Sequence, residues 1–158
     1  MRIAIDLGQQ QLRLFDDADG LIRHYPVSTA LAGAGERMDS GCTPRGLHVV
    51  RARIGADADP YAVFRGRRPT GERWTPQLAA ANPQRDWVLG RILWLSGREP
   101  GFNRLGDCDS MRRYIYIHGT GDDQPMGVPR SHGCVRMRVA DVVELFAQVP
   151  VGTLVEIL

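Results

Sequence analysis

Apolar and polar residues alternate along most of the chain, as they do in strands with one buried face. The alternation begins at residues 2–6 and 10–15, on either side of LGQQ, and returns at residues 21–27 after the polar turn DDADG. Further strand candidates lie at residues 46–54, 61–65, 88–95, 113–118 and 153–158, with turn-forming Gly, Pro, Asn and Asp between most of them. The pattern predicts a mainly β protein that opens with an antiparallel meander.

One segment has helical spacing instead. In VADVVELFAQV, residues 139–149, the apolar Val139, Val142, Val143 and Phe146 recur at intervals of three or four, and PVG ends the run. We expect an amphipathic helix that packs on the sheet. Two long turn-rich stretches, residues 28–46 and 65–86, are expected to frame or cover a cleft, because loops of that size in a small domain are usually functional or mobile.

Length and charge narrow the picture. The 158 residues, of which 43% are hydrophobic, favour one domain over residues 1–158. No apolar run is long enough to span a bilayer, and the net charge of +2 comes from scattered arginines, so we expect neither a membrane nor a nucleic-acid partner. The opening MRIAIDLGQQQLRLF does not resemble a secretory signal. If Met1 is the native start, the expected location is the cytoplasm, with the periplasm as the alternative.

The kinds of basic and sulfur-containing residues exclude several chemistries. All 20 basic residues are Arg, and without Lys the chain can form no Schiff base, P-loop or Ser-Lys dyad. Three cysteines, Cys42, Cys108 and Cys134, are an odd number at wide spacing with no C-x-x-C pair. A disulfide framework and a zinc ribbon are both poor interpretations of that spacing.

The segment RRYIYIHGT predicts a strand that ends at His118. A period of two places Tyr114, Tyr116 and His118 on one face, and the two isoleucines between them on the core face. Gly119 then allows the backbone to turn sharply. An isolated histidine at such a position usually does no more than cap the strand.

The loop Ser131-His132-Gly133-Cys134 precedes the helical pattern, and unpaired amides at a helix start favour an anion. We therefore expect a lowered pKa for Cys134 and a place for an oxyanion at the same amides. Taken alone, Cys134 would more often be a small buried apolar residue. Zinc held by His118, His132 and Cys134 is another alternative, but the H-x-C spacing is short for simultaneous coordination, and no metal is expected.

The motifs YIHGT and SHGCVRM together resemble the signature of the L,D-transpeptidase catalytic domain, the YkuD family. The segments IDLGQQQLRLF, YPVSTA, TPRG, VFRGRRPTGE, RILWL and VPVGTLVEIL also look like family segments in family order, so the resemblance covers nearly the whole chain. It implies a YkuD-like β-sandwich with one or more short helices, in which the catalytic Cys loop leads into a C-terminal helix.

The resemblance implies cysteine acyl transfer on peptidoglycan stem tetrapeptides. Cys134 would attack the carbonyl of the L-centre of the third residue, usually diaminopimelate, and expel the terminal D-alanine. His118 would be the general base, held by the carbonyl of Gly119. The backbone amides of His132, Gly133 and Cys134 would form the oxyanion hole.

Three further residues are expected to bind substrate: Arg136, Ser131 and Tyr116. Arg136 matches the family's Arg position and suits a carboxylate, with a salt bridge that holds the loop as the equal alternative. Cys42 and Cys108 lie outside the motif and are expected to be idle thiols. The resemblance implies no cofactor, a peptidoglycan-derived tetrapeptide or muropeptide as partner, and covalent inhibition by carbapenems.

Two outcomes are open for the thioester. Water would make the chain an L,D-carboxypeptidase of peptidoglycan recycling, and a diaminopimelate amine would make it a transpeptidase that forms 3→3 cross-links. Exported family members carry a signal peptide or anchor, and none is visible here, so water is favoured. A third alternative is a non-catalytic module that binds peptidoglycan fragments, for which we would expect a damaged motif, whereas this motif is intact.

Overall fold

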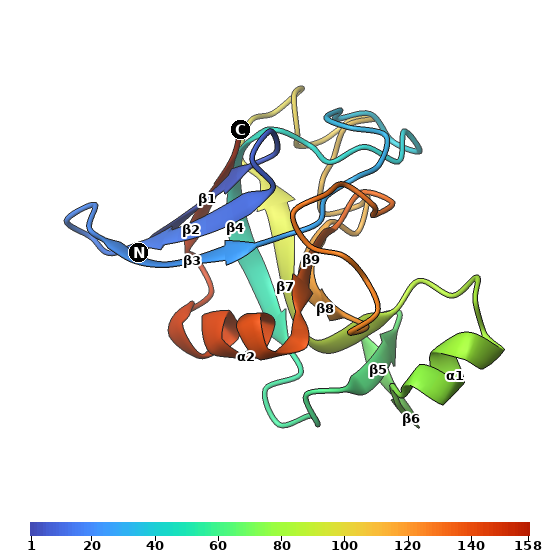
Figure 1. Ribbon diagram of the computed structural model, residues 1–158. Helices are drawn as coiled ribbons and strands as arrows, with labels where there is room; N and C mark the ends of the chain where they lie inside the picture. The colour runs from blue at the N-terminus through green and yellow to red at the C-terminus, as the bar shows by residue number, and fades with distance from the viewer.

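The computed structural model describes all 158 residues and confirms a mainly β protein, with ten strands in one curled sheet and two helices (Figure 1). The strands are β1 (Arg2–Asp6), β2 (Gln11–Phe15), β3 (Leu21–Pro26), β4 (Gly46–Ile54), β5 (Ala62–Arg65), β6 (Arg68–Arg73), β7 (Val88–Gly97), β8 (Tyr116–Thr120), β9 (Val135–Arg138) and β10 (Leu154–Ile157), and the helices are α1 (Pro76–Ala81) and α2 (Val139–Gln148).

The strand order is β3-β2-β1-β10-β4-β7-β5-β6, and β8 pairs with both β7 and β9. The first three strands form the predicted antiparallel meander. Most neighbouring strands are antiparallel, but β1 runs parallel to β10, and β8 runs parallel to β9. The parallel pair β8 and β9 carries the residues that the motif singles out.

The curled sheet surrounds a core of 19 buried residues contributed by nearly every strand and by α2. Helix α2 lies across one end of this core (Figure 1) and inserts Val142, Leu145 and Phe146. Burying each such side chain contributes about 1.5–3 kcal/mol. No helix of the protein is long and apolar enough to cross a bilayer.

Two elements interrupt the stretch expected to be a loop at residues 65–86. Strand β6 forms a hairpin with β5, and the short helix α1 follows it. The start of α1 has a sequence signal, because Thr75 caps the helix by accepting a hydrogen bond from the amide of Leu78, and Pro76 occupies the first turn. In Figure 1, the hairpin and α1 project beside β7, away from the N-terminal meander.

Candidate active site

The parallel pairing of β8 and β9 places the motif residues on one face of the sheet. His118 lies directly opposite Arg136, and residues opposite one another in a pair share a face. Two positions earlier along each strand are Tyr116 and Cys134, which therefore lie on that same face. The residues between them point into the apolar core on the other side. The register thus places the candidate nucleophile and base on the same face, although Sγ of Cys134 forms its hydrogen bonds with the backbone of β8 and the residues before it and none with His118.

The sulfur of Cys134 lies against β8. It accepts a hydrogen bond from the amide of Tyr116 and donates one to the carbonyl of Tyr114, both at 3.3 Å. Burial raises the pKa of the Cys134 thiol to about 12, although the positive charges of Arg136 and Arg113 act in the opposite direction. The resting thiol is therefore neutral and needs a base to become a nucleophile.

The expected lowering of this pKa by a helix start is wrong. Cys134 leads into strand β9, and α2 begins only at Val139. The helix dipole acts within the first turn of a helix and does not reach a thiol placed before the intervening strand.

His118 is the candidate base on the same face as Cys134. Its side chain is buried, and Nδ1 lies 2.7 Å from the carbonyl oxygen of Gly119. Because a carbonyl only accepts, Nδ1 carries the hydrogen, and Nε2 is left unprotonated in the neutral ring. Burial lowers the pKa of His118, whereas nearby Asp86 raises it, with a net lowering. The ring is therefore neutral at pH 7 and able to accept a proton.

A β-bulge in β7 shapes the strand beside His118. Leu89 pairs with Gly119 and Ile92 pairs with His118, so two residues of β7 are inserted opposite one step of β8. A Cβ on Gly119 would lie 2.6 Å from the carbonyl oxygen of Leu89. Only glycine permits this close approach of the two backbones, which positions the carbonyl that holds His118.

Two backbone amides in the Cys134 loop are free to bind an oxyanion. The amides of His132 and Cys134 donate to no acceptor in the protein. The third amide of the expected set, from Gly133, instead donates to the hydroxyl of Ser131 at 3.2 Å. Gly133 has a φ of 134°, a conformation that needs glycine. Of the three amides expected to form the oxyanion hole, two are thus unpaired in the resting protein, and their role stays a prediction.

Ser131 and Tyr116, both expected to bind substrate, have other partners. Ser131 is buried, and its hydroxyl donates to the carbonyl of Cys134 at 2.6 Å. Tyr116 is also buried, and its hydroxyl accepts a hydrogen bond from Arg67 at 3.0 Å. In the resting protein these side chains hold the loop and the wall of the site, and their expected contacts with substrate stay predictions.

Tyr114 does not share the face of His118 as the alternation predicted. It has a φ of 56° and precedes β8, which begins at Tyr116, and its side chain is exposed. The strand predicted at residues 113–118 is thus shifted toward its C-terminal end. The two isoleucines of the segment do lie in the core, as expected.

Arg136 forms the salt bridge that was one of its two expected roles. It is buried, and Nη2 donates to Oδ1 of Asp86 at 2.7 Å. Asp86 also lies 3.4 Å from Nδ1 of His132. Although partial burial raises the pKa of Asp86, nearby His118 and Arg136 bring it below its usual value. Sequence reasoning did not single out Asp86, because it belongs to no motif and to no periodic segment.

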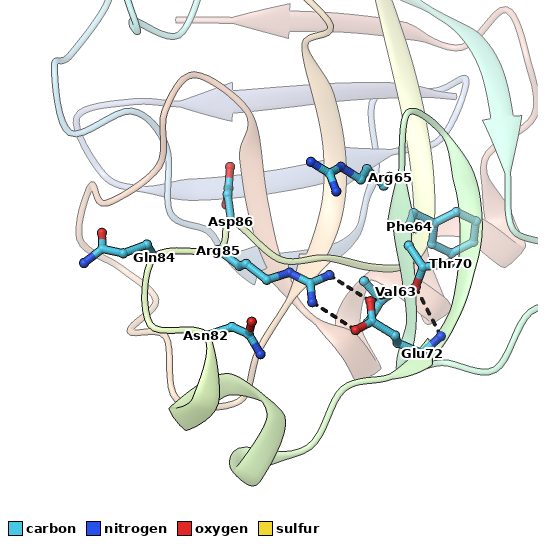
Figure 2. Close-up of a pocket in the computed structure, with 9 residues that line it drawn as sticks. All are labelled: Val63, Phe64, Arg65, Thr70, Glu72, Asn82, Gln84, Arg85 and Asp86. Carbon is cyan, nitrogen blue, oxygen red and sulfur yellow. Dashed lines mark hydrogen bonds and ion pairs between the residues drawn. The ribbon is translucent and has the colours of Figure 1, made fainter.

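The two long stretches both border the site, as predicted. In the first, Thr43 donates to the carbonyl of Gly133 at 2.8 Å, and Ser28 forms two backbone hydrogen bonds of 2.9 Å with Arg136. The second contributes to a cavity of about 690 Å³ between the β5–β6 hairpin and the segment after α1 (Figure 2). In this cavity Arg85 forms a two-pronged ion pair with Glu72.

A smaller cavity of about 240 Å³ lies on the Asp86 side of the Cys134 loop. Its charged walls are Arg85, Asp86, Arg130 and Arg136, with His132 at one end. Nowhere in the protein do three His, Cys, Asp or Glu side chains gather as metal ligands. All three cysteines are free thiols.

The chain matches known sequences over its whole length. The YkuD family model, described as the L,D-transpeptidase catalytic domain, matches residues 1–157. A putative L,D-transpeptidase YkuD of Bacillus licheniformis is 27% identical over 156 residues, which are 99% of this chain and 64% of that protein. The probable L,D-transpeptidase ErfK/SrfK of Salmonella typhimurium is 35% identical over 100 residues, which cover 58% of this chain and 29% of that protein. The chain therefore spans less than two thirds of these relatives.

Solved structures share the fold. An L,D-transpeptidase from Enterococcus faecium matches 99% of this chain and 49% of its own, with a TM-score of 0.59 and 16% identity. Bd1075 of Bdellovibrio bacteriovorus matches 99% of this chain and 47% of its own, with a TM-score of 0.60 and 17% identity. With the family model covering all but the last residue, this chain belongs to the YkuD family of L,D-transpeptidase catalytic domains.

Proposed function

We propose that the chain is a cysteine acyltransferase that cleaves the bond between the L-centre of the third residue and the terminal D-alanine of peptidoglycan stem tetrapeptides. One observation carries the proposal. Cys134 and His118 lie on one face of the β8–β9 pair, and the hydrogen bond from His118 to Gly119 leaves Nε2 able to take the thiol proton.

The reaction proceeds in two halves. As Sγ of Cys134 attacks the peptide carbonyl, its proton passes to His118, and the oxyanion forms beside the free amides of His132 and Cys134. Collapse of this intermediate breaks the C–N bond, and His118 returns the proton to the amine of D-alanine. An acceptor then attacks the thioester, gives its proton to His118 and releases the Cys134 thiol.

Water is the favoured acceptor. The cavity beside His132 carries Arg130 and Arg136 against the carboxylate of Asp86, and its third arginine, Arg85, is paired with Glu72. This excess of positive charge disfavours the ammonium form in which an amine acceptor arrives, and it does not oppose uncharged water. The alternative is an amine acceptor and a 3→3 cross-link, which agrees with the names of the L,D-transpeptidase relatives. A non-catalytic binding module would not require the paired Cys134 and His118.

The test is incubation of the purified protein with a tetrapeptide muropeptide, with and without an amine acceptor, followed by mass analysis of the products. We expect tripeptide and free D-alanine in both cases, and no product from Cys134→Ala. A cross-linked product that dominates when the amine is present would replace the carboxypeptidase by the transpeptidase. Cleavage that persists in a folded Cys134→Ala protein would overturn the nucleophile.

Carbapenem trapping identifies the nucleophile independently of the stem peptide. A solved L,D-transpeptidase matched by this chain is a complex with imipenem, and another is an avibactam carbamoyl enzyme. We expect intact mass to show one imipenem adduct on the wild type and none on Cys134→Ala. Cys42→Ala is the matched control, because it removes another free thiol and should leave the adduct in place.

A further inference from the structure

Two arginine–carboxylate pairs in the protein differ in completeness. Arg45 donates to Glu36 through both Nε and Nη2, at 3.1 and 2.9 Å, and so forms a full side-on pair. Arg136 donates to Asp86 through Nη2 alone, at 2.7 Å. The pair beside the candidate catalytic residues is therefore only half formed.

The missing half leaves a buried donor without an acceptor. Nε of Arg136 is inaccessible to solvent and has no hydrogen-bond partner. Nε and Nη2 lie on one edge of the planar guanidinium, which suits the two oxygens of one carboxylate. The Arg136 side chain is 7% exposed, whereas that of Asp86 is 42% exposed. Asp86 thus lies on the solvent side of this edge and leaves its Nε donor without an acceptor.

The position of Arg136 indicates which carboxylate could bind to its Nε and Nη2 edge. Arg136 lies two residues after Cys134 on the same face of β9, about 6.6 Å along the strand, and opposite His118. One residue of extended peptide spans about 3.5 Å. A C-terminal carboxylate one or two residues beyond the scissile carbonyl therefore lies about 3.5–7 Å along the strand, in the range of the Arg136 position, and the proposed function makes it the carboxylate of the single leaving residue.

The surrounding charge favours an anion at this place. Asp86 is the one carboxylate that lines the cavity of about 240 Å³, and Arg85 and Arg130 line it together with Arg136. Arg85 is neutralised by its ion pair with Glu72, so Arg130 and Arg136 against Asp86 leave one excess positive charge, which attracts a second carboxylate and stabilises it when Asp86 moves aside.

We propose that Asp86 occupies, as an internal carboxylate, the subsite on Arg136 for the C-terminal carboxylate of the leaving residue, and that bound substrate takes its place. The incoming carboxylate forms two hydrogen bonds where Asp86 forms one. No covalent bond changes in this exchange. The identity of the substrate rests on the proposed function, but the exchange itself is a property of Arg136 and Asp86.

The test measures binding, without turnover, in a Cys134→Ala background. The ligands are a stem tetrapeptide that ends in free D-alanine and the same peptide with a C-terminal amide, titrated by calorimetry. Adding Asp86→Ala should tighten binding of the acid about tenfold, because the competing carboxylate is gone and Arg136 gains a charge-assisted partner. The amide should bind as before, so the acid-to-amide ratio should rise. Asp86→Asn keeps the shape and should shift the ratio in the same direction.

The matched control is Glu36→Gln in the same background, which breaks the complete pair with Arg45 and should leave both affinities unchanged. Weaker binding of the acid in both Asp86 variants, an equal change for acid and amide, or no binding of the acid at all would overturn the proposal. A failure of the proposed function would instead appear as absent turnover by the wild type, whatever the acid-to-amide ratio in the inactive proteins.

Discussion

The two faces of the β8–β9 pair perform different tasks with the same backbone. One face carries Ile117 and Val135, fully buried in the apolar core. The other face carries His118, Cys134 and Arg136, which are held by a few hydrogen bonds and charges. The first face is stabilised by contact area, and the second by a few directed interactions. Substitutions on the two faces should therefore separate stability from chemistry.

The largest effect is expected on the polar face. His118→Ala removes the proton acceptor, and the rate of Cys134 acylation by imipenem at pH 7 should fall by about 10²–10⁴-fold. The measurement is adduct formation over time by mass spectrometry. His132→Ala is the matched control, because its exposed ring is not the proposed base and most of the rate should remain. A normal rate in His118→Ala would transfer the role of base to another residue.

On the apolar face, Ile117→Ala should leave the chemistry in place and weaken the fold. Ile117 is fully buried, so its truncation should lower the free energy of unfolding by about 2–5 kcal/mol, and Ile117→Val by about 0.5–1.5 kcal/mol. Urea denaturation measures both values. If the folded Ile117→Ala protein acylated as slowly as His118→Ala, the two faces would not be separable.

The pH profile sharpens the assignment of the base. Burial lowers the pKa of His118 below its usual 6.5, so the neutral ring persists at pH 7, and acylation should slow only as the pH falls below about 6.5. Asp86 raises this pKa, so Asp86→Asn should move the acidic limb to lower pH. The limb is measured by imipenem acylation across pH. A rate of acylation that already falls above pH 6.5 would contradict a buried neutral imidazole.

Protonation of buried histidines also affects the free energy of unfolding. His118 and His48 both have lowered pKa values through burial, so the unfolded chain binds more protons just below pH 6.5 than the folded chain does. The free energy of unfolding should therefore decrease as the pH falls through 6.5 toward the folded values.

The smallest effect is expected for Tyr116→Phe. The substitution removes the hydroxyl that accepts from Arg67, while the guanidinium keeps its place 4.7 Å from the Trp94 ring. The cost should be about 0.5–1.5 kcal/mol of stability, seen as a small decrease in Tm. Acylation should persist, because Cys134 is held by the backbone amide of Tyr116. A large loss of acylation would instead identify Tyr116 as a substrate contact.

The sequence predicted those strands and helices in which the pattern of apolar and polar residues extends over enough positions to be recognised. The N-terminal meander, β4 and α2 were predicted within one or two residues. Strand β9 was missed because VRMR is only four residues long and runs directly into the helical pattern that begins at Val139. Its identity comes from pairing with β8, which no local pattern records. That error also produced the wrong expectation for the pKa of Cys134.

Of the residues in the candidate site, only those that belong to a sequence motif could be predicted. The motif indicated Cys134, His118 and Gly119; the structure shows the hydrogen bond between His118 and Gly119 and places Cys134 on the face of His118, and their catalytic roles stay predictions. It did not indicate Asp86, which lies 50 residues before Arg136 in the chain and meets it only in the folded protein. Nor could it show that the hydroxyl of Ser131 would occupy the amide of Gly133. Motifs record residue identity, whereas these contacts depend on tertiary packing.

The contacts that hold the Cys134 loop have a consequence for biosynthesis. Thr43 is 90 residues from Gly133, and Ser28 is 108 residues from Arg136. Such long-range contacts form late, after the intervening chain has been ordered. A nascent chain on the ribosome therefore lacks the assembled thiol site until the residues of β9 have emerged. The surroundings of the Cys134 thiol are therefore complete only when the whole domain has folded.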